Sequence, residues 1–390
     1  MPQVHDEMTQ ARETWSTGWL LPRVMLCFFV LDLALRFVPL GPLAFRAWEA
    51  MLRHYPNAIG PFIPNKHYHR DVSYGGVASI GNLPALRHTH PADFTTDALG
   101  FHDPPALSRG NPVGIVIGDS FAVGSELRED ESLTAQLTRR SGAYFYNAGA
   151  PQPLHLRSLE QVAQRIGLRR GYVIFEYLES RALEDPPAAT PDGGGGKIQT
   201  AIFRALGPDW TDRLGTPLNQ LHASPLEVVS IKVEKRLQNN SLLPNSFSRF
   251  VIEEKLRNGE PIVFLPEEFR SPADPRKVAD RWARYFGWYA DSLRKDGLQL
   301  IVFLVPNRPT IYGPLLAYPR DVSRAVSTLA ELEAGVRRAG VEVVSLEPRF
   351  SNEAPSMLAE RKYLYLLDDT HWSGTGTAIA ADELFHLIQH

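Results

Sequence analysis

A serine, a histidine and two aspartates stand in contexts that suit acyl-transfer or hydrolytic chemistry. Ser120 lies in Gly118-Asp-Ser-Phe121, directly after the apolar run 113–117, and a helical pattern follows at about 130–140. A turn between a strand and a helix holds a serine hydroxyl at the rim of a sheet, where a nucleophile can reach a substrate. Because Gly-Asp-Ser also occurs in simple turns, the serine needs a base elsewhere in the chain.

The last loop before the carboxyl-terminal helix supplies a candidate base. His371 follows Asp368 and Asp369 in the segment 367–372. A serine becomes a good nucleophile when an imidazole takes its proton and a carboxylate fixes the imidazole tautomer. The pattern therefore predicts a Ser-His-Asp site in which His371 deprotonates Ser120 and one of the two aspartates orients His371. The alternative is that the aspartates cap the final helix while the histidine packs in the core.

The fold must bring these residues together, and the order of apolar segments indicates how. Five apolar or β-branched runs are typical of buried strands, and they lie at 113–117, 144–147, 172–178, 298–305 and 341–346. Helical patterns between them predict a three-layer α/β/α sandwich with a central parallel sheet. The carboxyl ends of parallel strands meet at one edge, so the Ser120 turn and the His371 loop can meet there.

Composition excludes several classes of protein. A net charge of −3 over 390 residues gives no electrostatic reason to expect nucleic acid as a partner. The one cysteine, Cys27, excludes an internal disulfide framework and a cysteine-based metal site. We expect solvated loop histidines, no metal and no other cofactor, because no carboxylate completes a ligand set with the five histidines before the first strand. These are His67, His69, His88, His90 and His102.

The N-terminal segment, residues 1–45, contains an apolar run from Trp19 to Leu40. Its length suffices to cross a bilayer, which takes about 20 residues. Arg23, Asp32 and Arg36 interrupt the run, and charges are costly near the bilayer centre. The run is either a membrane anchor with charged ends or a hydrophobic docking helix, and we favour the anchor.

The remainder divides into a connection and a catalytic domain. Residues 46–110 are rich in Pro, Gly and His and are expected to wrap around the domain that follows. Residues 111–390 are expected to form that domain. Within it, the segment at about 186–272 interrupts the βαβ order and carries the glycine run 193–196, so we expect an inserted, lid-like subdomain.

The motifs resemble those of the SGNH/GDSL hydrolase superfamily, over roughly residues 95–183 and 274–388. Three blocks of the superfamily are matched in order by Gly118-Asp-Ser-Phe121, Asn147-Ala-Gly149 and Asp369-Thr-His-Trp372. The resemblance implies a flavodoxin-like sandwich with Ser120 as nucleophile. It also implies that the backbone amide of Gly149, next to Asn147 in the second block, donates to the oxyanion.

The third block departs from the superfamily. Where an asparagine of the oxyanion hole is usual, the chain has Glu179-Ser-Arg181 at the end of its third strand. Together with the later segment 305–312 and the Asp-Thr-His-Trp motif, this is similar to the alginate-type O-acetyltransferases. That resemblance implies that Asp369, two residues before the histidine, is the orienting carboxylate. The N-terminal apolar run is also similar to that of membrane-anchored members.

Four further residues have two interpretations each. Arg181, held by Glu179, either substitutes for the missing asparagine or forms a structural salt bridge. Arg308 and Tyr312 either line the groove for the acceptor or are ordinary loop residues.

The resemblance implies a function as well as a fold. An acyl-serine on Ser120 would pass its acyl group, most simply acetyl, to a hydroxyl of an extracytoplasmic polysaccharide. A membrane-bound O-acyltransferase would supply the acyl group, and the chain would be anchored in the inner membrane with its catalytic domain in the periplasm. The same residues also serve a carbohydrate or acyl esterase. A third hypothesis is a non-catalytic polysaccharide-binding or assembly subunit, although the complete set Ser120, Asp369 and His371 counts against it.

Overall fold

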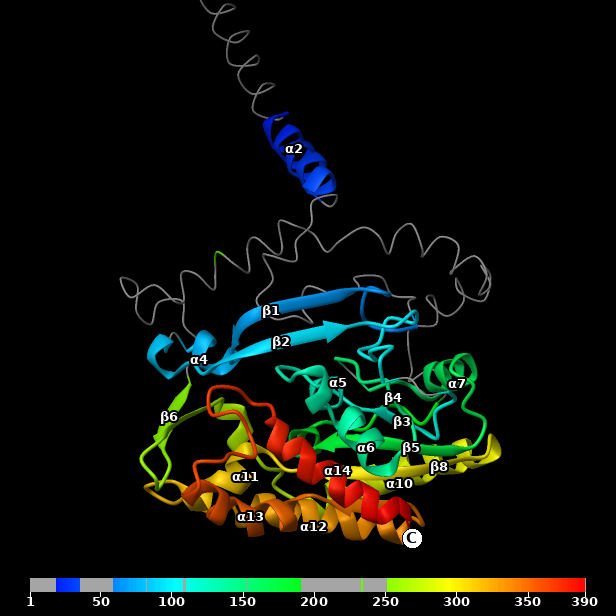
Figure 1. Ribbon diagram of the computed structural model, residues 1–390, viewed down its shortest axis with the longest axis vertical. Coiled ribbons are helices and arrows are strands. Elements are labelled where there is room, and N and C mark those ends of the chain that lie inside the picture. Colours follow the sequence, from blue (N-terminus) through cyan, green and yellow to red (C-terminus); the bar gives the residue numbers. More distant parts are fainter. Residues whose placement is uncertain are drawn as a thin grey trace, which may run out of the picture.

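A parallel sheet of five strands, in the order β4-β3-β5-β8-β9, forms the centre of the fold (Figure 1). The computed structural model describes residues 19–35, 59–81, 83–107, 110–151, 153–190, 233 and 251–389. The strands of the sheet are β3 (Gly114–Ile117), β4 (Phe145–Asn147), β5 (Gly171–Leu178), β8 (Leu298–Val305) and β9 (Glu342–Ser345). All neighbouring strands in this sheet are parallel, which confirms the predicted α/β class.

The apolar character of β3 follows from burial on both faces of the sheet. Successive strand residues point to opposite faces, so a strand covered on both sides needs an unbroken apolar run. In β3, Ile115 and Ile117 belong to one core cluster, and Val116 between them belongs to the other. All three side chains are fully buried.

Helices cover both faces. One core cluster includes α7 (Leu156–Arg165), α10 (Pro275–Lys295) and α12 (Ser323–Arg338). The other includes α5 (Ser120–Val123), α6 (Leu133–Ser141), α11 (Arg308–Tyr312), α13 (Glu347–Ala359) and α14 (Gly374–Gln389). The aromatic face of α10 is core, as expected from its helical spacing, since Trp282 and Phe286 pack edge-on against Tyr177 of β5. Short 3₁₀ helices lie at Pro84–Leu86, Glu129–Glu131, Glu179–Leu183, Pro266–Phe269 and Gly313–Leu315.

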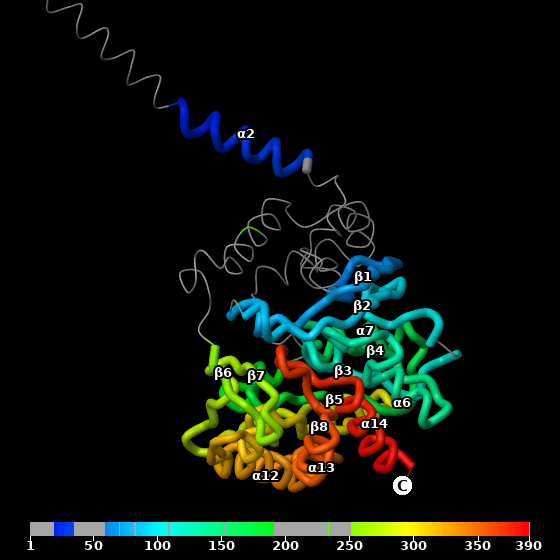
Figure 2. Tube along the Cα trace, turned by 60° about the vertical axis from the view of Figure 1, so that its left-hand side comes forward, coloured from blue at the N-terminus to red at the C-terminus, as the bar shows by residue number. Residues whose placement is uncertain are grey.

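Two antiparallel hairpins lie outside this sheet (Figure 2). The first pairs β1 (His67–Tyr74) with β2 (Thr89–Thr95), and α4 (Gly76–Ile80) lies between them in sequence. The second pairs β6 (Ile252–Lys255) with β7 (Pro261–Phe264). The amide of Val263 in β7 donates to the carbonyl of Leu367 at 3.1 Å, so the second hairpin is attached to the loop that carries His371. Most of the expected insertion at 186–272 lies outside the described residues.

The helix α2 (Leu20–Leu35) occupies the apolar N-terminal run. Its large side chains are exposed, with Leu21 at 68 % and Phe29 at 65 %. Among the helices in the described part of the chain, none combines the length and the hydrophobicity needed to cross a membrane. The membrane anchor therefore stays a prediction.

Candidate active site

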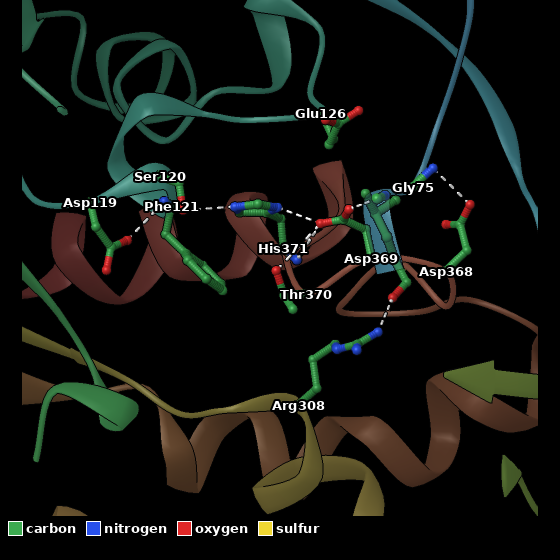
Figure 3. Close-up of polar contacts among 12 residues, drawn as sticks. Gly75, Asp119, Ser120, Phe121, Glu126, Arg308, Asp368, Asp369, Thr370 and His371 are labelled. Atoms are coloured by element: carbon green, nitrogen blue, oxygen red, sulfur yellow. Dashed lines mark hydrogen bonds and ion pairs between the residues drawn. The ribbon is translucent and has the colours of Figure 1, made fainter. Parts of the chain in front are cut away.

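Ser120, His371 and Asp369 are joined by a chain of hydrogen bonds (Figure 3). Nε2 of His371 lies 2.8 Å from Oγ of Ser120, and Nδ1 of the same ring lies 2.5 Å from Oδ1 of Asp369. A carboxylate only accepts, so Nδ1 carries the proton and Nε2 presents a lone pair to the serine hydroxyl. Asp369 is fully buried and His371 is 3 % exposed, which protects the chain of bonds from water.

The Ser120 turn is built by its two preceding residues. Gly118 directly follows β3, and a Cβ at this position would lie 2.3 Å from Oε2 of Glu176, so no larger residue fits without displacement. Asp119 caps α5, because its Oδ1 accepts from the amide of Phe121 at 3.0 Å. These constraints place Ser120 at the first residue of α5, at the carboxyl edge of the sheet.

The loop that carries His371 is held by its own backbone. The amide of Leu366 donates to the carbonyl of His371 at 3.0 Å, and Tyr365 forms an antiparallel bridge with Trp372. The amide of His371 also donates to Oδ1 of Asp369 at 3.2 Å. The carboxylate therefore meets both the backbone and the ring of the same histidine, which fixes the ring relative to Ser120.

Asp368 and Asp369 are both bound by backbone amides from the segment after β1. Gly76 donates to Oδ2 of Asp369 at 2.5 Å, and Gly75 donates to Oδ2 of Asp368 at 2.9 Å. The amide of His88 also donates to Oδ2 of Asp368, at 2.8 Å, whereas burial raises the pKa of this carboxyl. Neither aspartate caps the final helix, so that interpretation was wrong.

The final helix is capped by a serine. Oγ of Ser373 accepts from the amide of Gly376 at 3.2 Å, and its carbonyl accepts from the amide of Thr377 at 3.0 Å. The serine directly follows the Asp-Thr-His-Trp motif. Residues 369–372 are therefore not needed to cap the helix and can form the site.

Gly75, Gly76 and His88 are parts of this site that no motif in the sequence predicted. They lie about 280 to 293 residues before the aspartates they bind, and they bind through backbone amides. The one signal in the sequence is the pair Gly75-Gly76 after an alternating strand pattern. A Cβ on Gly75 would lie 2.4 Å from the carbonyl oxygen of Asp368, which explains glycine at that position.

The expected pairing of Arg181 with Glu179 is wrong. Arg181 donates to Oδ2 of Asp119 through Nε at 3.2 Å and Nη2 at 3.1 Å. Glu179 instead binds the start of α11, where it accepts from the amide of Asn307 at 2.9 Å and from Oγ1 of Thr310 at 2.6 Å. Burial raises the pKa of Glu179 to about 7. Arg181 thus supports the nucleophile turn through the residue before Ser120.

Glu176 is a further residue of this region that no sequence motif predicted. It is fully buried in β5, and its Oε2 accepts from the amide of Asp119 at 2.9 Å. Burial, and next the negative charge of Asp119, raise the pKa of Glu176 well above its ordinary value. The carboxyl lies behind the nucleophile turn, and the nearby Arg181 cation acts in the opposite direction and lowers its pKa.

Gly149 and Asn147 are close to the nucleophile turn, but the amide of Gly149 is already bound. It donates to Oδ1 of Asn147 at 2.9 Å in this structure, so its role as an oxyanion donor stays a prediction. A Cβ on Gly149 would lie 2.3 Å from the amide nitrogen of Val123 in α5, which shows how closely this turn packs against the serine helix. For the amide of Ser120 itself, no acceptor is found among the described residues.

Arg308 and Tyr312 are buried, so the expectation that they line an acceptor groove is wrong. Arg308 is 1 % exposed and binds the Glu268 carboxylate through Nε at 3.1 Å and Nη2 at 3.0 Å. Its Nη1 donates to the carbonyl of Leu366 at 3.0 Å (Figure 3). The Tyr312 hydroxyl accepts from the amide of Leu364 at 2.8 Å. Both side chains hold the base of the His371 loop.

The expectation that no carboxylate completes a ligand set with the histidines is wrong for His67 and His69. His67 and His69 lie on β1, and one ligand atom from each lies within 4.8 Å of a carboxylate oxygen of Asp93 on β2. His90 lies on β2 and faces Glu126, with 3.4 Å between Nε2 and Oε2. His102 is buried and neutral, because desolvation lowers its pKa.

Comparison with known proteins places the carboxyl-terminal part of this site in a family. Residues 262–390 match the family model of the SGNH hydrolase-like domain of the acetyltransferase AlgX. Over this carboxyl-terminal third, the chain is similar to the SGNH hydrolase-like domain of that acetyltransferase. The matched region contains Asp369 and His371, whereas Ser120 lies before it.

Two individual proteins are similar to parts of this chain. A probable alginate O-acetylase, AlgJ, of Pseudomonas putida is 27 % identical over 127 residues. That alignment covers 32 % of the chain and 31 % of the relative, so the chain spans about a third of the length of the curated protein it matches. The crystal structure of a carbohydrate acetylesterase family member from Sinorhizobium meliloti matches over 71 % of the chain and 97 % of that protein, with 9 % identity and a TM-score of 0.29.

Proposed function

We propose that this protein transfers an acyl group, most simply acetyl, through an acyl-serine on Ser120 to a hydroxyl of an extracytoplasmic polysaccharide. The observation that carries the proposal is the hydrogen-bonded order Ser120, His371, Asp369, with 2.8 Å and 2.5 Å between the bonded atoms. The relation to alginate O-acetyltransferases supports the transfer and the sugar acceptor. We also propose that the domain around this site has the three-layer α/β/α architecture of SGNH enzymes.

The first half of the reaction forms the acyl-serine. Nε2 of His371 takes the proton from Oγ of Ser120 as Oγ bonds to the acyl carbon of the donor. The bond between that carbon and the donor oxygen then breaks, and His371 returns its proton to the leaving oxygen. Asp369 stabilises the imidazolium in between, through the bond to Nδ1.

The second half repeats the chemistry with a sugar hydroxyl. His371 takes the proton of the hydroxyl, whose oxygen bonds to the acyl carbon of the acyl-serine. The bond from that carbon to Oγ of Ser120 breaks, and the serine recovers its proton from His371. Hydrolysis would follow the same path with water as the acceptor, so exclusion of water decides between transfer and esterase activity.

The amide of Ser120 is the proposed donor to the oxyanion in both halves. It belongs to the turn that places Oγ, so it lies next to the carbon that Oγ attacks. The amide of Gly149 could join it only by giving up the bond to Oδ1 of Asn147. This arrangement replaces the asparagine that the superfamily uses.

The acyl donor and the location belong to the same proposal. A membrane-bound O-acyltransferase would hand over the acyl group, and residues 19–40 would anchor the chain in the inner membrane with the catalytic domain in the periplasm. The exposed apolar side chains of α2 support an apolar environment for this segment.

Acetyl transfer from 4-nitrophenyl acetate to alginate oligosaccharides, compared with release of free acetate, tests the proposal. Wild type should acetylate the sugar faster than it releases acetate, and Ser120→Ala should lose both activities. Ser356→Ala is the matched control, because Ser356 is an exposed serine in α13 and its loss should change neither activity. Circular dichroism should show that all three proteins are folded.

Three results would change the conclusion. Acetate release without sugar acetylation, lost in Ser120→Ala, identifies an esterase. Unchanged activity in Ser120→Ala removes the serine from the mechanism. Absence of both activities, together with failure of a fluorophosphonate to label Ser120, supports a non-catalytic polysaccharide-binding subunit.

A further inference from the structure

The exposed face of the β1–β2 hairpin gathers two imidazoles and a carboxylate. His67 and His69 are two residues apart on β1, so they point to the same side of the strand. Their partners across the hairpin are Thr95 and Asp93, which are also two residues apart and share that side. His67 and His69 therefore lie on the same face as Asp93. Their rings are nearly parallel, with an interplanar angle of 13° and 6.4 Å between ring centres.

The separations within this cluster fit a divalent ion after small side-chain movements. Nδ1 of His69 lies 2.7 Å from Oδ1 of Asp93, and Nε2 of His67 lies 3.9 Å from the same oxygen. Ligands about 2.0 Å from a tetrahedral Zn²⁺ are about 3.3 Å from one another. The two measured distances lie on either side of that value, so one must lengthen and the other shorten by roughly 0.6 Å.

The second nitrogen of each ring is held by an oxygen, as in metal-ligating histidines. Nδ1 of His67 lies 2.7 Å from Oγ1 of Thr95, and a proton on Nδ1 leaves the Nε2 lone pair facing Asp93. Nε2 of His69 lies 3.1 Å from Oδ1 of Asp71, and it can keep that bond while a metal ion displaces the proton that Nδ1 now donates to Asp93. Such outer contacts fix the tautomer and orientation of a ligating imidazole.

The cluster is open to a cation from solvent. The side chains of His67 and His69 are 57 % and 49 % exposed, and that of Asp93 is 30 % exposed. No lysine or arginine in the described part of the chain forms an ion pair with Asp93. A bound ion would complete its coordination with water.

We propose that His67, His69 and Asp93 form a binding site for a borderline divalent cation of the Zn²⁺ class. Two imidazoles and one carboxylate suit Zn²⁺ and its neighbours in the transition series, whereas Mg²⁺ and Ca²⁺ prefer oxygen ligands. The ion would cross-link β1 to β2, in a hairpin whose strand β1 leads into Gly75 and Gly76. The site is separate from Ser120 and does not depend on the proposed acyl transfer.

Zn²⁺ titration of the untagged, full-length protein after treatment with EDTA tests the site. Isothermal titration calorimetry should show saturable binding of one ion at this site, and Co²⁺ should give the absorption bands of a low-symmetry site with nitrogen and oxygen ligands. His69→Ala and Asp93→Asn should abolish this binding. Thr95→Val and Asp71→Asn, which keep all three ligands, should weaken it by about 10- to 100-fold.

The controls separate this site from general binding by surface histidines. His155→Ala and His386→Ala each remove an exposed histidine outside the cluster and should leave the titration unchanged. Thermal unfolding should show a rise in Tm with Zn²⁺ in wild type and no rise in His69→Ala. A wild type that fails to bind Zn²⁺, or a His69→Ala variant that binds it as tightly as wild type, would overturn the proposal. Excess Mg²⁺ that displaces Zn²⁺ would also overturn it.

Discussion

The backbone amide of Gly76 donates to Oδ2 of Asp369 at 2.5 Å, across 293 residues of sequence. Oδ1 of the same carboxylate binds the ring of His371, so one carboxylate joins the segment after β1 to the base of the site. The neighbouring amide of Gly75 binds Asp368 in the same way. The part of the chain that precedes the sheet is therefore built into the candidate active site.

Gly75→Ala should lower both stability and turnover. The new Cβ would lie 2.4 Å from the carbonyl oxygen of Asp368, so the loop with His371 must shift. Overpacking of this kind costs about 1–3 kcal/mol, and a misplacement of about 1 Å in a catalytic group can cost on the order of 10²-fold in rate. Urea unfolding and kcat for acetyl-ester cleavage measure the two effects.

Gly287→Ala is the control for that substitution. Gly287 lies inside α10, and a Cβ there would have Ala339 Cβ as its nearest neighbour at 3.6 Å. Alanine favours a helix interior over glycine, so this variant should be as stable as wild type or more stable by up to about 1 kcal/mol. A Gly75→Ala protein that behaves like Gly287→Ala would show that the contact with Asp368 is unimportant.

Asp369→Asn and Asp368→Asn should have very different effects on catalysis. Only Asp369 binds the His371 ring, and an asparagine there permits the wrong imidazole tautomer, so kcat should fall by about 10⁴-fold. Asp368 binds only backbone amides in the described structure, and an asparagine oxygen can accept from both of them. Asp368→Asn should therefore keep most of the wild-type kcat. Equal losses in the two variants would contradict the assignment of Asp369.

Arg308→Met should destabilise the fold because the Glu268 carboxylate would lose its cationic partner. Arg308 is 1 % exposed and holds Glu268, Val263 and Leu366 together. Removing one member of a buried ion pair costs about 3–5 kcal/mol, measured here by urea unfolding.

Arg308→Lys keeps the positive charge and should lose less stability than Arg308→Met. Where that variant is folded, KM for the sugar acceptor should equal the wild-type value, because Arg308 is buried away from solvent. A raised KM with unchanged stability would instead indicate that Arg308 contacts the acceptor.

Glu176→Gln should make stability less dependent on pH. Burial raises the pKa of Glu176 in the folded state, whereas an unfolded glutamate ionises above about pH 4.3. Wild type therefore loses stability as the pH rises from that value towards the folded pKa, since only the unfolded state readily releases the proton. Glutamine cannot ionise and still offers an oxygen to the amide of Asp119.

The measurement is the free energy of unfolding in urea at pH 4 and at pH 8. The free energy of unfolding of Glu176→Gln minus that of wild type should be larger at pH 8 than at pH 4. Glu342→Gln removes an exposed glutamate on β9 and should show no such change. An equal difference between Glu176→Gln and wild type at both pH values would mean that folding does not raise the pKa of Glu176.

Much of the fold followed from local patterns that the sequence displays. The run Gly114–Ile117 has the unbroken apolar character that burial on both faces requires, and the helical spacing of Trp282 and Phe286 predicts their place in the core. The proximity of Ser120 and His371 was predictable as well, because both lie in loops at the edge of the sheet where the carboxyl ends of parallel strands meet.

Side-chain partners were less predictable, because they depend on direction as well as on distance in sequence. Glu179 and Arg181 are two residues apart, yet Glu179 binds Asn307 and Thr310 while Arg181 turns back to Asp119. The pairing of β5 with β8 brings the end of β8 beside Glu179, and no local pattern encodes that choice.

The amino-acid sequence by itself determined the α/β class, the residues of the Ser-His-Asp set and the spacing of His67 and His69. The tertiary structure decided which carboxylates these residues meet: Asp369 for His371, and Asp93 for His67 and His69. The physical reason is that periodicity records which face a residue occupies, whereas strand register and loop docking decide what lies opposite. Gly75 and Gly76 show the same limit: the glycine pair after a strand pattern indicates a close approach, but nothing in either segment says which residue, 293 positions away, their amides bind.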